Sequence, residues 1–267
     1  MSAFVQALGD SAVVARRNLI RIKRVPDLLV FATLQPIMFV LLFSYVFGGS
    51  IDIPGMAYEE FLMAGIFAQT VIFGSTTTGS GLAEDMQKGV IDRFRSLPMA
   101  RSAVLAGRTA SDLVSNGISV VVMSLTGLLV GWRIHSSPLE ALAGFALLLL
   151  FAYAMSWVMA LVGLMVRTPE VFNNASFMAI FPLTFIANTF VQEGNLPGPL
   201  KVFAQWNPVS AVTQAARVLF GNTNPMFPPP DAWPLQHPVL ATLGWVALIL
   251  AVFVPLATRQ YRRAVSR

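Results

Sequence analysis

Six stretches of 20 to 26 residues contain no Asp, Glu, Lys, Arg or His, and no other feature limits the possible folds of this chain as strongly. A helix rises about 1.5 Å per residue, so about 20 residues cross the ~30 Å hydrocarbon layer of a bilayer. Helices are expected, because a spanning helix satisfies its own backbone polar groups and the alternating segments of a barrel are absent. The predicted spans are 28–47, 61–82, 113–132, 141–166, 171–192 and 239–258.

The composition agrees with an integral membrane protein. Of the 267 residues, 55% are hydrophobic and only 12% are charged, whereas a soluble domain has roughly 25% charged residues. Too little polar surface remains to cover a soluble globule, and the hydrophobicity also excludes a disordered chain. The chain has no Cys, so disulfides, thiolate metal sites and thiol catalysis are excluded. We find no internal repeat and no composition break, and we expect residues 1–267 to form a single transmembrane domain.

The basic residues set the expected orientation of these spans. Of the 18 Lys and Arg residues, all but Arg133, Lys201 and Arg217 fall in the segments that share a side with the two termini. By the positive-inside rule, both termini are predicted to face the cytoplasm, in a bacterial inner (plasma) membrane. A signal peptide is the alternative for the first span, but its apolar run is too long and no small-x-small cleavage site follows it.

The segment 2–24 is predicted to be an interfacial helix on the cytoplasmic leaflet. Its basic residues lie mostly off an apolar stripe, which suits burial in the leaflet together with attraction to anionic lipid. Pro26 would separate this helix from the first span. The alternative is a basic flank that serves topology only. The stripe consists of Phe4, Leu8, Ala12, Ala15, Leu19 and Ile22.

A short amphipathic helix is predicted in the cytoplasmic loop 83–112, within the sequence GVIDRFRSLPMAR. Asp92, Arg93 and Arg95 point away from its apolar stripe, and Pro98 ends the helix. The stripe has to be buried against either the membrane surface or a groove on a soluble partner. It is formed by Val90, Ile91, Phe94 and Leu97.

The external segment 193–238 is predicted to contain a short helix that folds back against the outer ends of the spans. Asn207 and Pro208 form a favourable N-cap and first-turn pair, and Gly221 is a plausible C-terminal stop. A surface helix without a role is the alternative. The apolar stripe of the predicted helix is Val209, Val212, Ala216, Leu219 and Phe220.

Two spans carry polar and aromatic faces that suit either helix packing or a cavity wall for a hydrophobic or aromatic ligand. Pro182 could loosen the fifth span where such a cavity opens. The face of the second span is formed by Thr70, Phe73, Thr77 and Ser80. That of the fifth span is formed by Asn174, Phe177, Phe181, Thr184 and Asn188, with Phe185 beside them.

The sequence contains no visible energy source for transport. No span holds an ionisable residue, and Glu84 and Asp112, at the cytoplasmic ends, are expected to be solvated boundary charges, so proton coupling is disfavoured. Sodium coupling through the backbone carbonyls of broken helices remains possible, but no feature of the sequence indicates it. The phosphate-binding G-x-x-x-x-G-K-[ST] loop and the common hydrolase motifs are absent, so we expect no enzyme, no cofactor and no metal bound by this chain.

Together these features resemble the type-2 ABC exporter permeases, and among them the daunorubicin/doxorubicin-resistance permease family. The resemblance covers nearly the whole chain. Its best motifs are EDMQKGVIDRFRSLPMARSAVLAGR, residues 84–108, and FPLTFIANTFVQEGNLPGPLKVFAQWNPVSAVTQAARVLFGN, residues 181–222. Ala187 and Gln192 depart from the Ser and Pro that many members have near these positions.

The resemblance implies a half-transporter that exports hydrophobic small molecules. A second permease copy or a sister permease would complete the pore, and two copies of a separate ATP-binding subunit, carrying ATP and Mg²⁺, would drive it. It assigns the segment 2–24 to a connecting helix, the second and fifth spans to the substrate cavity, and Asn207, Pro208 and Arg217 to re-entrant external helices. Residues implied to couple to the ATPase are Glu84, Asp85, Lys88, Gly89, Val90, Ile91, Arg93, Phe94, Arg95, Leu97, Pro98 and Arg101.

Other functions remain open from the sequence alone. The same fold could export a lipid-like or glycan product, although no aromatic track for a long carbohydrate is visible. The chain could also be an ATP-independent carrier or a membrane scaffold, and a membrane enzyme has the least support. No nucleic-acid partner is expected, because the basic residues follow the membrane topology.

Overall fold

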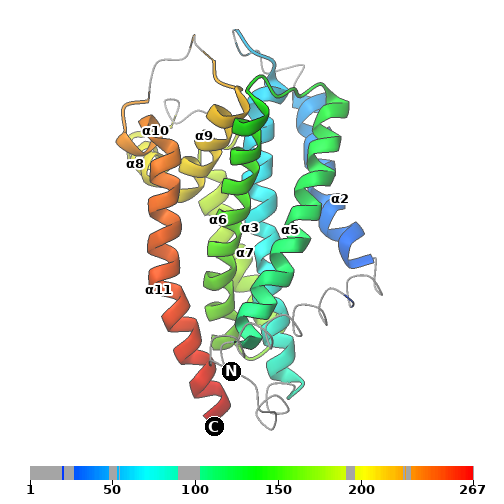
Figure 1. The fold of residues 1–267 in the computed structure, drawn as a ribbon, viewed down its shortest axis with the longest axis vertical. Helices are drawn as coiled ribbons and strands as arrows, with labels where there is room; N and C mark the ends of the chain where they lie inside the picture. Colours follow the sequence, from blue (N-terminus) through cyan, green and yellow to red (C-terminus); the bar gives the residue numbers. More distant parts are fainter. Residues whose placement is uncertain are drawn as a thin grey trace.

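The polypeptide folds into a bundle of long helices that run alternately in opposite directions, with three short helices gathered at one end (Figure 1). The computed structural model describes residues 20, 27–47, 53, 55–89, 103–190, 196–224, 226 and 230–266. Every regular element within these residues is helical, so the all-α prediction is confirmed for them. The elements are α2 (Asp27–Leu42), the π-helix η1 (Phe43–Phe47), α3 (Tyr58–Gln87), α5 (Ala103–Val130), α6 (Pro138–Met165), α7 (Pro169–Phe185), α8 (Gly198–Trp206), α9 (Pro208–Phe220), α10 (Trp233–Gln236) and α11 (Pro238–Ser266).

Four of the described helices are long and apolar enough to cross a bilayer: α3, α5, α6 and α11. The other two predicted spans coincide with α2 and α7, which have 16 and 17 residues. The expectation that the fifth span is helical as far as residue 192 is wrong, because α7 ends at Phe185 and residues 186–190 form turns and bends. Their backbone groups are bonded to side chains of α9 in place of a further helical turn.

Glycine residues let α3 and α6 approach each other closely near the middle of the bundle. A Cβ atom on Gly163 would lie 2.3 Å from the carbonyl oxygen of Gly79, and one on Gly79 would lie 2.4 Å from the carbonyl oxygen of Met159. Small residues at a crossing permit close packing of helices in a bilayer. The α3–α6 contact therefore depends on the absence of side chains at these two positions.

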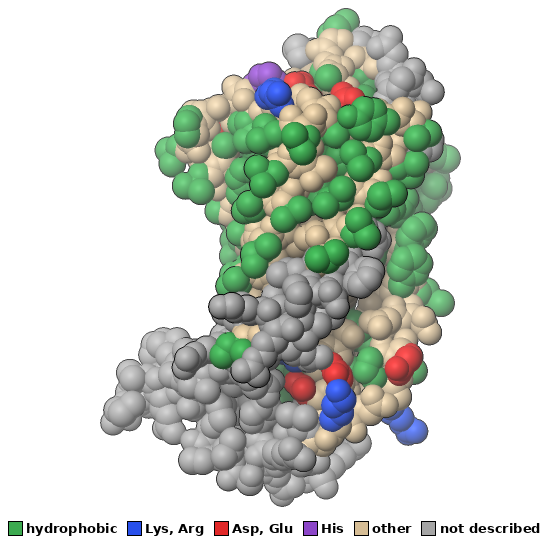
Figure 2. Space-filling view, turned by 90° about the vertical axis from the view of Figure 1, so that its right-hand side faces the viewer, with side chains coloured by type: hydrophobic (Ala, Val, Ile, Leu, Met, Phe, Trp, Pro, Cys, Tyr) green, Lys and Arg blue, Asp and Glu red, His purple; other side chains and the backbone are tan. Residues whose placement is uncertain are grey.

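The surface of the bundle matches a membrane environment. Figure 2 shows hydrophobic side chains over a broad band of one face, with charged side chains gathered toward its two ends. On α5, Val121, Leu125 and Leu129 are 59%, 59% and 85% exposed, which suits contact with lipid or with another subunit. In Figure 1, α8, α9 and α10 lie at one end of the bundle, and α3 and α11 terminate at the other end.

The predicted interfacial helix 2–24 lies outside the described residues, except for Ile20, which is helical and exposed.

Candidate functional site

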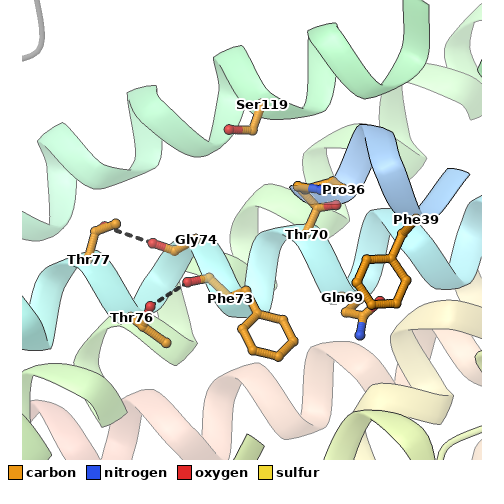
Figure 3. A pocket seen from close by; sticks show the side chains of 9 residues that line it. All are labelled: Pro36, Phe39, Gln69, Thr70, Phe73, Gly74, Thr76, Thr77 and Ser119. Carbon is orange, nitrogen blue, oxygen red and sulfur yellow. Dashed lines mark hydrogen bonds between the residues drawn. The ribbon is translucent and has the colours of Figure 1, made fainter. Parts of the chain in front are cut away.

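A pocket of about 240 Å³ lies between α2, α3 and α5, roughly midway along the bundle (Figure 3). It combines apolar walls with amide and hydroxyl groups, and none of its lining side chains is ionisable. Such a pocket suits an uncharged, largely apolar group that forms a few hydrogen bonds. Its lining residues are Pro36, Phe39, Gln69, Thr70, Phe73, Gly74, Thr76, Thr77 and Ser119.

The polar wall of the pocket comes from the Thr-rich middle of α3. The hydroxyl groups of Thr76 and Thr77 donate hydrogen bonds to the backbone carbonyls of Phe73 and Gly74, at 2.6 and 2.7 Å (Figure 3). These local bonds allow hydroxyl side chains to sit inside a helix that crosses an apolar layer. The buried hydroxyl of Thr70 has no hydrogen-bond partner among the described residues.

The structure brings together only part of the predicted cavity. Thr70, Phe73 and Thr77 line the pocket, as expected for one face of the second span, whereas Ser80 does not. No residue of α7 lines it; the opposite walls come from α2 and α5 instead. Sequence reasoning missed Pro36, Phe39, Gln69, Gly74, Thr76 and Ser119, although Gln69 directly precedes the recognised Thr70.

The predicted face of the fifth span is divided in the structure. Asn174, Phe177 and Phe181 are exposed, while Thr184 is buried and its hydroxyl donates to the carbonyl of Ile180 at 3.0 Å. Asn188 lies beyond the end of α7 and is buried in the following turn. The five residues therefore do not form one open helical surface.

Phenylalanine rings connect α7 with both aromatic residues of the pocket. Phe177 packs against Phe73 with ring centroids 6.5 Å apart. From Phe177 the contacts continue along α7 and through the turn to α2, with successive centroids 4.2 to 5.9 Å apart. The α7 side chains thus contact the pocket walls without lining the pocket. In order, the rings are Phe177, Phe181, Phe185, Phe190, Phe43 and Phe39.

The structure contains a helix where the sequence predicts one after Asn207, namely α9. The side chain of Asn207 caps its N-terminus by accepting from the backbone N–H of Val209 at 2.9 Å, and Pro208 is its first residue. Gly221 ends the helix in the left-handed conformation, with φ 72°, which a residue without a Cβ adopts easily. The packing of α9 against other helices buries nine of its 13 residues.

Polar side chains of α9 and its cap bind the backbone of the end of α7. The Asn207 amide donates to the carbonyl of Leu183 at 2.7 Å, and the backbone N–H of Asn188 donates to the Ser210 hydroxyl at 3.1 Å. Arg217 donates to the carbonyls of Asn188 and Thr189 at 2.7 and 3.3 Å. Side chains of α9 and its cap thus satisfy backbone groups that lie outside a regular helix.

Charged residues cluster where α3 and α5 lead into the cytoplasmic loop of the prediction. Lys88 pairs with Glu84 within α3, and Arg108 of α5 pairs with Asp85 of α3 at 3.1 Å. The expectation that Asp112 is a solvated boundary charge is wrong: this residue is 7% exposed and accepts a hydrogen bond from Thr78, because α5 begins before the predicted span.

The predicted coupling helix itself lies outside the described residues. Of the residues implied to contact the ATPase, Glu84, Asp85, Lys88 and Gly89 are described, at the end of α3 and in the turn that follows. The others, which stay a prediction, are Val90, Ile91, Arg93, Phe94, Arg95, Leu97, Pro98 and Arg101.

Comparisons with known proteins connect this geometry to membrane transport. Residues 11–220 match the sequence profile of the family described as ABC-2 type transporter. A daunorubicin resistance ABC transporter permease protein of Streptomyces coeruleorubidus is 31% identical over 246 residues, which cover 92% of this chain and 83% of the relative. A probable doxorubicin resistance ABC transporter permease protein of Mycobacterium tuberculosis is 24% identical over 87% of this chain and 81% of the relative. A putative transport permease of Cyanophora paradoxa is 25% identical over 84% of this chain and 77% of the relative.

Proposed function

Because the chain belongs to the ABC-2 type transporter family, we propose that it is the membrane-spanning permease subunit of an ATP-driven exporter of hydrophobic small molecules, such as drugs or antibiotics. The observation that carries the choice of substrate is the uncharged pocket between α2, α3 and α5. Two named relatives are resistance permeases for daunorubicin and doxorubicin, which makes compounds of this kind suitable first probes.

The size and polarity of the pocket define how a ligand binds in this proposal. Pockets for drug-sized ligands have volumes of roughly 300–1,000 Å³, so about 240 Å³ accommodates only part of such a molecule. Phe39 and Phe73 provide aromatic contacts for a ring system, and the Thr70 hydroxyl provides a hydrogen bond. The remainder of the ligand would extend beyond the pocket toward the exposed Phe177 and Phe181 or toward a second permease.

The energy for transport comes from a separate subunit in this proposal. Two copies of an ATP-binding subunit hold ATP and Mg²⁺ and dock on the cytoplasmic segment between α3 and α5, where the apolar stripe of Val90, Ile91, Phe94 and Leu97 is predicted. ATP binding favours one of two arrangements of the permease, and it shifts their populations only by its difference in affinity for them. A second copy of this chain or a sister permease completes the transport path.

The orientation follows from the distribution of charge. In this proposal both termini face the cytoplasm of a bacterial inner membrane, and α8, α9 and α10 lie on the outer side. Lys88, Arg167 and Arg259 lie at the end of the bundle shared by the C-terminus of α3 and the C-terminus of α11. This asymmetry supports the proposed orientation through the positive-inside rule.

The test is daunorubicin-stimulated ATP hydrolysis by the chain reconstituted in liposomes with its ATP-binding subunit. Phe73→Ala and Thr70→Val are expected to raise the daunorubicin concentration for half-maximal stimulation. For Thr70 the loss of one hydrogen bond, about 0.5–1.5 kcal/mol, corresponds to roughly a twofold to tenfold increase. Thr126→Val is the matched control, because its hydroxyl donates within α5 to the carbonyl of Val122 and lies outside the pocket. Identical responses of all variants would remove the pocket from the transport path.

A further inference from the structure

One face of α5 carries a buried polar stripe that begins near its first turn and ends at the pocket. Arg108, Asp112, Asn116 and Ser119 are spaced four, four and three residues apart, which places them on one side of a helix. These residues are 8%, 7%, 2% and 8% exposed. Buried polar residues are costly within a bilayer and tend to serve a function. Ser119 is itself a lining residue of the pocket.

The stripe fits into spaces that two glycines leave on α3. A Cβ atom on Gly81 would lie 1.4 Å from Nη2 of Arg108, so the guanidinium group occupies the position of the missing side chain. A Cβ atom on Gly74 would lie 2.0 Å from Oδ1 of Asn116. The two helices therefore interlock at two positions separated by about two turns.

Buried charges join the same two helices at their cytoplasmic ends. Nη1 of Arg108 lies 3.1 Å from Oδ2 of Asp85, and its Nε lies 4.0 Å from the carboxylate of Asp112. Asp112 also accepts a hydrogen bond from the hydroxyl of Thr78 on α3. Nη2 of Arg108 donates at 3.5 Å to the backbone carbonyl of Thr77, a residue of the pocket wall.

These contacts oppose independent motion of α3 and α5. Separating the partners of a buried ion pair is unfavourable, because it leaves buried charges without compensation. The third wall of the pocket, α2, is built differently: it contains Pro36 and passes into the π-helix η1, and both features interrupt the regular helical ladder. The pocket thus lies between an interlocked helix pair and a separate, less regular helix.

We propose that α3 and α5 move as one rigid lever, and that Arg108 is the positioning residue that keeps them together. When the cytoplasmic segment that connects the two helices is displaced, the lever transmits this displacement to the pocket. There it shifts Thr70, Thr77 and Ser119 relative to Phe39 of α2. The role of the lever in transport rests on the proposed function, but the rigidity of the α3–α5 pair can be tested without any substrate.

The first experiment compares Arg108→Gln with Arg108→Lys in the complex with the ATP-binding subunit. Arg108→Gln is expected to keep complex assembly and basal ATP hydrolysis within about twofold of wild type and to lose most of the stimulation by daunorubicin. Arg108→Lys keeps a cation near Asp85 and is therefore expected to restore part of the stimulation by daunorubicin. Arg262→Gln, an exposed residue of α11, is the control. Full stimulation in Arg108→Gln overturns the proposal.

The second experiment fixes the helix pair covalently, in a chain that has no natural Cys. Cγ of Asn116 lies 2.9 Å from the Cβ position of Gly74, and its own Cβ is one bond of about 1.5 Å further away. The two Cβ atoms therefore lie within about 4.4 Å, inside the range of a disulfide. Gly74→Cys with Asn116→Cys is expected to cross-link on oxidation and to retain the daunorubicin response of its reduced form. Loss of that response on oxidation, with recovery on reduction, overturns a rigid lever.

A third measurement separates failure of the lever from failure of the proposed function. In membranes that contain the complex, the thiol reactivity of Ser119→Cys is expected to change when a non-hydrolysable ATP analogue is added, and to stay constant when Arg108→Gln is also present. This readout uses no drug. The lever is overturned if the nucleotide analogue does not change the reactivity of Ser119→Cys in the otherwise wild-type chain. It is also overturned if the analogue changes this reactivity equally when Arg108→Gln is present. Absence of daunorubicin stimulation in the wild type, with the nucleotide response intact, counts against the substrate class alone.

Discussion

Arg217 offers the sharpest test of how the end of the bundle that carries α9 is stabilised. This residue is 4% exposed and lies within α9. Besides the carbonyls of Asn188 and Thr189, its guanidinium donates to the carbonyl of Phe61 in α3 at 3.2 Å and stacks over the Phe61 ring at 3.9 Å. One side chain therefore joins three segments that are distant in sequence.

The expected cost of Arg217→Met follows from these contacts. The carbonyls of Asn188 and Thr189 lie in a turn, where each unsatisfied buried group costs about 1–3 kcal/mol. The carbonyl of Phe61 lies in the first turns of α3, where a helical N–H can still reach it, so we assign it no cost. The lost cation–π contact adds about 0.5–2 kcal/mol. The loss in free energy of unfolding is thus roughly 2.5–8 kcal/mol, a large effect for a single substitution.

The assay is thermal unfolding of the purified chain in detergent, with wild type, Arg217→Met and Val218→Ala measured in parallel. Val218, the next residue of α9, is 45% exposed and is the control, with an expected change below about 1 kcal/mol. Arg217→Lys should recover part of the loss, since an ammonium can reach only some of the three carbonyls. Equal unfolding temperatures for Arg217→Met and Val218→Ala would refute the reasoning.

Two further predictions concern helix contacts and capping. Gly163→Ala is expected to destabilise the bundle by about 1–3 kcal/mol in the same unfolding assay, because its Cβ would meet the backbone of Gly79 at 2.3 Å. Gly117→Ala, with no atom within 4 Å of its Cβ, should be neutral or slightly stabilising; a similar loss for both variants would contradict the packing argument. Asn207→Ala removes both the α9 cap and the bond to Leu183, and a loss of about 1–3 kcal/mol is expected. No measurable change for Asn207→Ala would mean that other groups satisfy these partners.

The helical architecture could be predicted because hydrophobicity and local capping are properties of contiguous residues. Among the described residues, the absence of charge predicted α2, α3, α5, α6, α7 and α11, and the Asn207–Pro208 pair with Gly221 predicted α9. The length of α7 could not be predicted in this way. Residues 186–190 carry no charge, like those of a spanning helix, and some of their backbone groups are bonded to side chains more than 20 residues later in the chain.

The walls of the pocket, like the length of α7, depend on contacts between segments that are distant in the sequence. A helical face can be read from its own span, so Thr70, Phe73 and Thr77 were identified together. Which helices supply the opposite walls depends on packing, and the aromatic face of the fifth span suggested α7 where the structure has α2 and α5. Asp112 was misjudged for a related reason: its burial comes from the approach of Thr78 on another helix.

The two buried arginines, Arg217 and Arg108, each attach α3 to another helix. Near one end of α3 Arg217 binds the carbonyl of Phe61, and near the other Arg108 binds Asp85 and the carbonyl of Thr77. The pocket-lining segment 69–77 lies between Phe61 and Asp85. Because α3 is held to α9 at one end and to α5 at the other, sliding it along its axis would break contacts at both ends at once. A tilt about the external attachment breaks fewer of them, and it moves the pocket wall by an amount that grows toward the cytoplasmic end, where ATP-driven force would be applied in the proposed mechanism.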